Sequence, residues 1–354
     1  LTRPELAVLL AYGKLELKRE MIAGRGPDDP FFEARLDDYF PKPLRRWREP
    51  IRRHRLRRDI IATVAANDIV NRCGPSFPSR LMAAARCDAA AFMAAYEAAK
   101  AVLDIERLWS AVAALDGKVS AQGQMALFRR ISAALRGATY WLARRAGREN
   151  LAVAALVQRY GAGFKSLHRL LPEALSPVEQ AAVEARVAQL METGAPEREA
   201  RAVAVLQPLT TAADLVDLAE ASSWTTPHVA RLDDAAGEAF AFDRLRAAAG
   251  EFTAGDAFER TAVRRLLEDL LAEQAQLTRA IMDFAGGAQA GEDAGHAHDA
   301  VASWIALRRE PAATARRAID EIEAAGGAWT FAKLTIANAA LRELVAQATS
   351  KRRR

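Results

Sequence analysis

Hydrophobic residues recur at intervals of three and four positions along most of the chain, which is the spacing of one face of an α-helix. The pattern is clear from the first residues, where Thr2 and Glu5 can form a capping box and Pro4 suits the first turn of a helix. The apolar positions that follow are Leu6, Leu9, Leu10, Leu17 and Met21. They predict a first helix that ends near Ile22.

Residues that can cap a helix precede several later apolar segments, because an aspartate or serine oxygen accepts from the unpaired amides of the first turn. The helices predicted from such caps are 88–100, 104–115, 120–145 and 176–191. Apolar spacing predicts further helices at 31–40, 44–71, 151–160, 227–249, 256–284, 297–309, 312–325 and 331–349. Breaks are expected at 147–149, 161–163 and 286–295. No segment alternates as a β-hairpin would, so the sequence predicts an all-α fold.

The expected architecture is an irregular multi-helix bundle with two helical subdomains. A chain of 354 residues is long enough for about two domains. The segment 171–176 is the expected boundary, which gives one subdomain at 1–172 and another at 173–354. We find no repeat of fixed period, so a solenoid is disfavoured.

Composition narrows the class of protein further. With 51% hydrophobic residues, 27% charged residues and a net charge of +5, the chain can bury a core and is not disordered. No apolar run is long enough to cross a bilayer, so we expect no membrane span. Cys73 and Cys87 form no CxxC pair and have no histidine beside them, so neither a zinc site nor a disulfide is indicated. We therefore expect a cytoplasmic protein.

Motifs that carry chemistry are weak in this chain. The GxG at 161–163 lacks a third glycine and a preceding strand, so it predicts a turn between helices rather than a nucleotide site. His296, His298 and Asp299 could offer ligands to a metal, but we favour solvent-exposed histidines, with Asp299 at a helix start. No nucleophile and base stand in a recognisable arrangement. We therefore assign no catalytic, cofactor-binding or metal-binding residue.

The densest charge feature is a run of arginines around His54, namely Arg45, Arg46, Arg48, Arg52, Arg53, Arg55, Arg57 and Arg58. On a helix they could neutralise the phosphates of a nucleic acid or another polyanion. Arginines also form bidentate pairs with carboxylates, and the chain carries 45 acids to its 50 bases. We favour a contact with another domain or subunit, over a solvated face or a polyanion site.

A polar group follows the apolar part of the predicted helix 44–71. Asn67, Asp68, Asn71 and Arg72 recur at spacings of three and four, which places them on adjoining helix faces. We favour capping of the turn near Gly74 or a contact with another domain, and a direct role in ligand binding is the less favoured alternative.

Several long strings resemble the C-terminal region of the large bacterial NAD-specific glutamate dehydrogenases. They are LTRPELAVLLAYGK at 1–14, DYFP at 38–41, HRLRRDIIAT at 54–63, ANDIVNR at 66–72, LW at 108–109, LD at 115–116 and KV at 118–119. The strings occur in order over residues 1–145, and beyond them the likeness is limited to helical character.

The resemblance implies a reaction for the parent polypeptide: oxidation of L-glutamate to 2-oxoglutarate and ammonia with NAD. It also implies that a catalytic lysine, a catalytic aspartate and a Rossmann-type NAD domain precede this region. The chain begins at Leu1 with no initiator methionine or leader, which fits an internal or C-terminal piece. No cofactor is expected within this segment.

Our first hypothesis is therefore a helical C-terminal region that is inactive alone and supports assembly or domain closure. Its expected partners are the upstream catalytic domain and other copies in a homo-oligomer. The candidate contact residues are Arg52, Arg53, Arg57, Arg58, Asn67, Asn71 and Arg72. The alternative is a free-standing adaptor that binds a polyanion or a protein partner through the arginine-rich helix.

Overall fold

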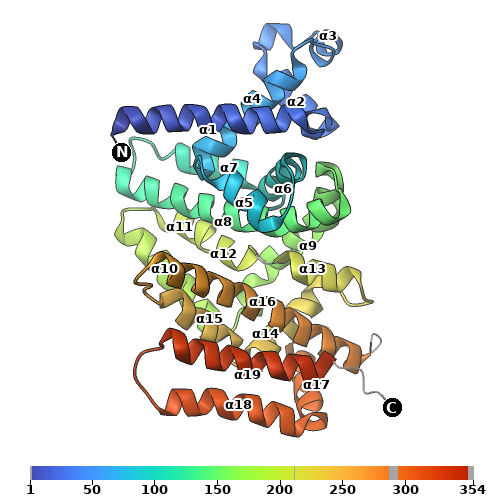
Figure 1. The fold of residues 1–354 in the computed structure, drawn as a ribbon, viewed down its shortest axis with the longest axis vertical. Helices are drawn as coiled ribbons and strands as arrows, with labels where there is room; N and C mark the ends of the chain where they lie inside the picture. Colours follow the sequence, from blue (N-terminus) through green and yellow to red (C-terminus); the bar gives the residue numbers. More distant parts are fainter. Residues whose placement is uncertain (1, 211, 287–293, 350–354) are drawn as a thin grey trace. The chain divides into compact units, whose positions relative to one another are not determined.

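The computed structural model describes residues 2–210, 212–286 and 294–349, and these residues form helices joined by short turns (Figure 1). No strand occurs within these ranges, so the all-α prediction is confirmed. The first elements are α1 (Arg3–Ala23), η1 (Gly26–Asp28), η2 (Pro30–Phe32), α2 (Glu33–Tyr39), η3 (Lys42–Leu44), α3 (Arg48–Arg52), α4 (Arg57–Cys73), α5 (Phe77–Ala85), α6 (Ala89–Val102), α7 (Ile105–Ala113) and α8 (Ala121–Glu149).

The remaining helices complete the chain. They are α9 (Val153–Ala174), α10 (Pro177–Glu192), α11 (Glu197–Ala204), α12 (Leu206–Leu209), α13 (Ala212–Glu220), α14 (Thr226–Ala239), α15 (Phe242–Glu251), α16 (Ala257–Ala285), α17 (Ala294–Leu307), α18 (Arg309–Ala324) and α19 (Phe331–Thr349). No single helix of the described ranges is long and apolar enough to span a membrane, although the bent pair 197–209 and 213–220 reaches that length and apolarity when joined.

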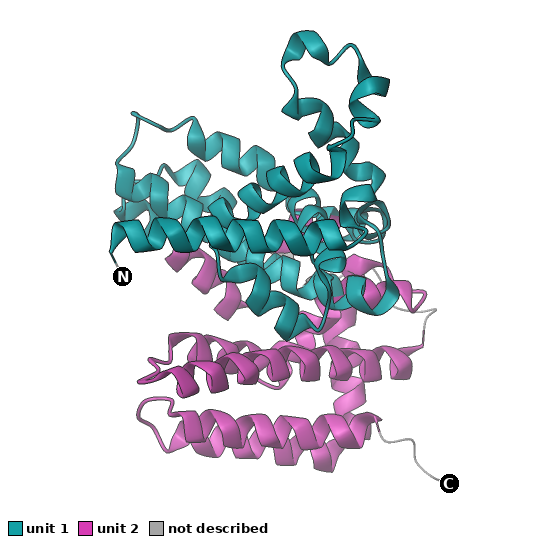
Figure 2. Ribbon diagram, turned by 45° about the horizontal axis from the view of Figure 1, so that its top comes forward, with its two compact units in different colours: residues 1–165, 187–213 teal, residues 166–186, 214–354 magenta. Residues whose placement is uncertain are grey.

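The chain divides into two compact units that interleave along the sequence (Figure 2). Unit 1 holds residues 1–165 and 187–213, and unit 2 holds residues 166–186 and 214–354. Both α9 and α10 therefore contribute residues to each unit. The predicted subdomain boundary between 172 and 173 lies within this crossing region and stays a prediction.

Capping hydrogen bonds explain where several helices begin. The amide of Glu5 donates to Thr2 Oγ1 at 3.5 Å, and the Glu5 carboxylate accepts from the Thr2 amide at 2.6 Å, which completes the predicted capping box. Asp88, Ser120 and Ser176 likewise accept from the first turns of α6, α8 and α10, at 2.8, 3.0 and 3.3 Å. These predicted starts are confirmed because each signal is local in sequence.

The cap predicted at Asp104 is placed correctly but works differently. Asp104 lies in the left-handed region with φ of 51°, and its side chain makes no capping bond to α7. Its carboxylate pairs with Arg107 one turn later. An ion pair has thus replaced the expected amide contact.

One predicted long helix, 44–71, is wrong, because the arginine-rich segment does not form a continuous helix. The short helix α3 ends at Arg52 and the chain turns before α4 begins at Arg57. The ring of His54 takes part in this turn, since its Nδ1 accepts from the amide of Leu56 at 3.1 Å. The arginines therefore project from two helices and a turn, and α4 ends as expected at Gly74, which has φ of 90°.

Two predicted breaks are also wrong. The helix α8 continues through 147–149 and ends at Asn150 in the left-handed conformation, and α9 runs through 161–163 without a turn. Gly147 lies inside α8 because the helix passes close to Cys87. A Cβ on Gly147 would lie 2.9 Å from the Cβ of Cys87, so only glycine fits there without a shift. The predicted loop 286–295 falls mostly outside the described residues; Gly286 ends α16 and α17 begins at Ala294.

A further difference lies in unit 2, where the predicted helix 227–249 is two helices. The chain bends between α14 and α15 at Ala241, which has φ of 58°. Its neighbour Phe240 turns into the core and meets Trp304 edge to face at 6.2 Å between ring centroids. Leu277 and Leu341 are fully buried in the same core. Burial of the aromatic ring thus accompanies a bend that helical spacing alone does not predict.

In unit 1, the core lies where α6 packs against α8. Fully buried residues on these helices include Phe92, Tyr96, Leu127, Ile131 and Leu135. Alanines fill the intervening positions on α6, so the two helices approach closely. The site described below is built on this core.

Close packing at the start of α8 gives a first prediction. A Cβ on Gly123 would lie 2.8 Å from the carbonyl carbon of Gly194 and 2.8 Å from the carbonyl oxygen of Thr193, and neither backbone atom can move alone. We expect Gly123→Ala to lower the free energy of unfolding by about 2 kcal/mol, measured by urea denaturation. The matched control is Gly161→Ala in α9, where the only neighbour is Val157 at 4.0 Å, so a gain of about 0.5–1 kcal/mol is expected. Equal effects of the two substitutions would contradict this account.

Candidate functional site

The arginines singled out from the sequence are held by acids of unit 1. Arg52 Nη1 lies 3.0 Å from the carboxylate of Glu33, and its other terminal nitrogen lies 3.8 Å from Asp37. Arg53 contacts the side chain of Glu49 one turn earlier, at 3.5 Å, and its side chain is 84% exposed. Of these two residues, Arg53 is therefore the one directed to solvent.

Two further arginines bind the turn that follows α1, and one of them also binds the end of that helix. Arg58 lies 2.5 Å from Asp28 and donates to the backbone oxygens of Ile22 and Gly24 at 2.7 and 2.6 Å. Arg57 contacts the same Asp28 carboxylate at 3.4 Å. A cation on the free carbonyls of a helix C-terminus is favourable, so these contacts tie α4 to the turn that follows α1.

The polar residues of α4 point in two directions. Asn67 and Asn71 are exposed and lie one turn apart, so they share a solvent-facing side of the helix. Arg72 instead turns inward. Its Nε lies 2.9 Å from Asp68, its Nη2 lies 2.8 Å from Glu106, and its guanidinium stacks 4.7 Å from the ring centroid of Trp109. The predicted contact role of the seven candidate residues stays a prediction, and all five of the arginines have carboxylate partners within unit 1.

Arg72 belongs to a group of six charges that four helices bring together, which we call the ionic cluster. Its members are Arg35 of α2, Asp68 and Arg72 of α4, Glu97 and Lys100 of α6, and Glu106 of α7. Lys100 Nζ lies 2.8 Å from Asp68 and 2.5 Å from Glu106, and Arg35 Nη2 lies 2.5 Å from Glu97. The side chains of Glu97 and Lys100 are each only 3% exposed.

The electrostatics of the ionic cluster are balanced, with three cations and three carboxylates. Burial raises the pKa of Glu97, an effect that Arg35 and Lys100 partly offset. For Glu106 burial also opposes ionisation, but hydrogen bonds from Arg72 and Lys100 outweigh it and lower the pKa to about 2. The Tyr96 hydroxyl donates to Asp68 at 3.1 Å. Each carboxylate of the ionic cluster faces a cation from another helix. These ion pairs therefore link the four helices to one another.

Glu97 and Lys100 were not predicted as members of a polar site from the sequence. They stand three residues apart in a helix that is otherwise made of alanine and large apolar side chains. An acid and a base on the apolar face of a helix indicate a buried pair, because an isolated charge there would be very costly. That signal was present in the sequence, whereas the partners from α2 and α7 depend on the tertiary fold.

Unit 2 has a second polar group, around Asp233 of α14. Its carboxylate accepts from Thr278 Oγ1 and from Gln274 Nε2, each at 2.8 Å. Burial raises the pKa of Asp233 to about 6 and that of the adjacent Asp234 to about 7. Arg246 reaches Gln274 and lies 2.9 Å from Glu179. The carboxyl groups of Asp233 and Asp234 therefore titrate close to neutral pH.

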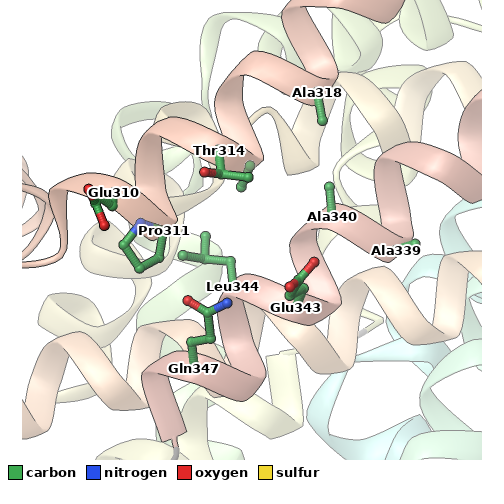
Figure 3. Close-up of a pocket in the computed structure, with 10 residues that line it drawn as sticks. Glu310, Pro311, Thr314, Ala318, Ala339, Ala340, Glu343, Leu344 and Gln347 are labelled. Atoms are coloured by element: carbon green, nitrogen blue, oxygen red, sulfur yellow. The ribbon is translucent and has the colours of Figure 1, made fainter.

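An open pocket of about 520 Å³ lies between α18 and α19 (Figure 3). Its space comes from small side chains on facing helices, which include Ala318 and Ala340. Glu310, Glu343 and Gln347 add polar groups, and Figure 3 shows Glu343 and Gln347 on the same helix as Leu344. The pocket thus combines an alanine-lined interior with acidic groups.

The remaining candidates from the sequence carry no site. His298 Nε2 lies 3.4 Å from Glu238, and His296 is exposed on α17. Asp299, expected at a helix start, lies inside α17. No group of three or more histidine, cysteine, aspartate or glutamate side chains could hold a metal ion within the described ranges. Both cysteines are free thiols, and burial raises the pKa of Cys73 to about 12 and that of Cys87 to about 11.

Comparison with known proteins identifies the family. Residues 1–343 match the family described as "Glutamate dehydrogenase, C-terminal". The NAD-specific glutamate dehydrogenase of Halomonas elongata is 29% identical over 353 residues, which are 99% of this chain and 21% of that protein. The protein of the same name from Pseudomonas aeruginosa is 32% identical over 68% of this chain and 15% of its own length.

A third relative, the NAD-specific glutamate dehydrogenase of Mycobacterium tuberculosis, is 28% identical over 92% of this chain and 20% of its length. The chain thus spans about a fifth or less of each of these relatives. The matched family covers both compact units, including the ionic cluster. The chain therefore belongs to the family of glutamate dehydrogenase C-terminal regions.

Proposed function

We propose that this chain is the helical C-terminal part of a large NAD-specific glutamate dehydrogenase. The observation that carries the proposal is the family match over residues 1–343, together with relatives of which the chain spans 15–21%. In the parent polypeptide, L-glutamate is oxidised to 2-oxoglutarate and ammonia with NAD. The catalytic and NAD-binding residues belong to the part that precedes this chain, and the parent is a cytoplasmic homo-oligomer of amino-acid catabolism.

Within that enzyme the chain supports assembly or domain closure and contributes no catalytic residue. The ionic cluster supports this role, because its charges are paired with one another and fix α2, α4, α6 and α7 as one body. Arg53, Asn67 and Asn71 are exposed polar residues of the same unit, and they are the proposed contact points for another domain or subunit.

A free-standing adaptor that binds polyanions is less well supported. Arg52, Arg57 and Arg58 face acids of their own unit, so part of the positive charge counted in the sequence is neutralised. A filter-binding titration with nucleic acid tests this alternative. Tight binding that weakens steeply with salt would favour it, and weak binding at low ionic strength would dismiss it.

Truncation of the full-length enzyme immediately before Leu1 tests the proposed role. We expect the truncated enzyme to show a changed oligomer size or altered cooperativity, measured by light scattering and by glutamate-dependent NADH formation. Because truncation can also unfold the remaining polypeptide, a full-length enzyme with Arg53→Ala, Asn67→Ala and Asn71→Ala is the milder variant. Normal assembly and kinetics in both would contradict a supporting role. NADH formation by residues 1–354 alone would move the active site into this chain.

A further inference from the structure

The N-terminal half of α1 exposes a long apolar surface. Residues 6–12 contain no charged or strongly polar side chain, and the apolar surface continues to Leu15. We call residues 6–15 the α1 apolar segment. Its large exposed side chains are Leu6 (43%), Val8 (55%), Leu9 (51%), Leu10 (39%), Tyr12 (68%) and Leu15 (61%). Contiguous exposed apolar surface of this kind marks an interaction site, whereas isolated exposed apolar residues do not.

The exposed side chains surround the helix. Successive residues of an α-helix are turned by about 100°, so Leu6 and Val8 lie on nearly opposite faces and Leu9 lies between them. A helix that is apolar all round is normally buried on several sides. The second half of α1 shows the usual state, since Leu17 and Met21 are 3% and 0% exposed where α1 packs against α4 and α6.

Local signals set the start of α1, and packing of its second half on α4 and α6 holds the helix in place. The capping box at Thr2 and Glu5 and the proline at position 4 set its start. The α1 apolar segment is therefore a preformed rod, of which the following half is anchored in unit 1 (Figure 1). A partner that binds it loses little conformational entropy in ordering the helix.

Exposure of apolar side chains on all faces of the helix favours one kind of binding partner over another. A second copy of α1 in a symmetric helix pair would cover one stripe of each helix and leave the other faces in water. A groove in another domain would cover several faces of the helix at once. In the relatives about four-fifths of the polypeptide lies outside the region matched here, which is long enough to form such a domain. In the proposed full-length enzyme, covalent linkage gives an upstream domain a high effective concentration at α1.

We propose that the α1 apolar segment inserts into an apolar groove of the upstream part of the same polypeptide and so couples this chain to it. This inference rests on the proposed function, because it needs the upstream part of a large glutamate dehydrogenase. It places the main contact on α1, apart from the arginine and asparagine candidates on α3, α4 and the turn between them. The upstream surface is expected to be concave, apolar and poor in charge.

Site-specific photo-crosslinking in the full-length enzyme tests the proposal. Tyr12 is replaced by p-benzoylphenylalanine, which keeps an aromatic ring at a position that is 68% exposed. Phe258, which is 85% exposed at the start of α16, is replaced in the same way as the control. After irradiation and digestion, mass spectrometry identifies the crosslinked peptides. We expect peptides from the upstream part at position 12, in a yield at least fivefold above that at position 258.

Other outcomes overturn the proposal. They are a crosslink from position 12 to residues of this chain, a crosslink to α1 of another copy, and a yield no greater than at position 258. Leu9 serves as a second position if the Tyr12 variant does not assemble. Glutamate-dependent NADH formation is measured on the unsubstituted full-length protein. Absence of NADH formation by that protein refutes the proposed function, whereas an active protein whose substituted form gives no upstream crosslink refutes only this inference.

Discussion

Lys100→Met should destabilise unit 1 by about 3–5 kcal/mol, because the substitution leaves buried carboxylates without their cation. Lys100 is 3% exposed and lies 2.8 Å from Asp68, 2.5 Å from Glu106 and 3.7 Å from Glu97. Methionine keeps most of the side-chain volume, so the expected effect comes from charge rather than from a cavity. Urea denaturation followed by the fluorescence of the unit 1 tryptophans measures it.

The matched control is Arg53→Met, which also exchanges a cation for methionine. Arg53 is 84% exposed and contacts Glu49, so its substitution should change the free energy of unfolding by less than about 0.5 kcal/mol. The double variant Lys100→Met with Asp68→Asn should be less destabilised than the sum of its two single variants, because each removes a charge that the other leaves unpaired. Equal effects at positions 53 and 100 would show that the ionic cluster adds nothing to stability.

This cluster shows which features of the fold can be predicted from the sequence. The starts of α1, α6, α8 and α10 could be predicted, because each cap is decided within four residues. The pairing of Lys100 with Asp68 could not, since these residues are 32 positions apart and meet only when α4 packs against its neighbours. For the same reason the sequence did not show that Arg72 lies beside Glu106 of α7, and the contact of Arg72 with another domain stays a prediction.

In the arginine-rich segment, the local sequence pattern predicted the wrong structure. Its composition indicated a basic helix, but α3 stops at Arg52 and a turn containing His54 separates it from α4. In addition, Asp28 from η1 takes up both Arg57 and Arg58. Neither fact follows from the run of charges. Counting arginines therefore overestimated the cationic surface available to a polyanion or to another domain.

The leucines of the α1 apolar segment predicted a helix, since they follow helical spacing. The spacing identified the helix correctly, but within this chain only its second half contributes to a core. Sequence periodicity shows that a face is apolar and does not show which body covers it. The same leucines that predict a helix thus also indicate an interface, once the structure leaves them exposed.

The last prediction concerns the acids of unit 2 and the pH dependence of stability. Burial raises the pKa of Asp233 to about 6 and that of Asp234 to about 7, so the folded unit keeps these protons where the unfolded chain, with an ordinary pKa near 3.8, has released them. The stabilisation from the protonated form is complete below about pH 4 and is lost as the pH rises through 6 to 7. For Asp233 alone the change is about 3 kcal/mol.

Asp233→Asn imitates the protonated carboxyl and should flatten this dependence. The variant and the parent chain should be about equally stable at pH 4, while at pH 7 the variant should be the more stable by up to about 3 kcal/mol. Its amide oxygen can still accept from Thr278, and this preserves one of the two side-chain contacts. Thermal unfolding of unit 2 at a series of pH values measures the effect, with Asp320→Asn on the exposed side of α18 as the matched control. Parallel pH curves for the parent chain and Asp233→Asn would mean that Asp233 is ionised in the folded protein throughout this range, stabilised by Thr278, Gln274 and the nearby Arg246.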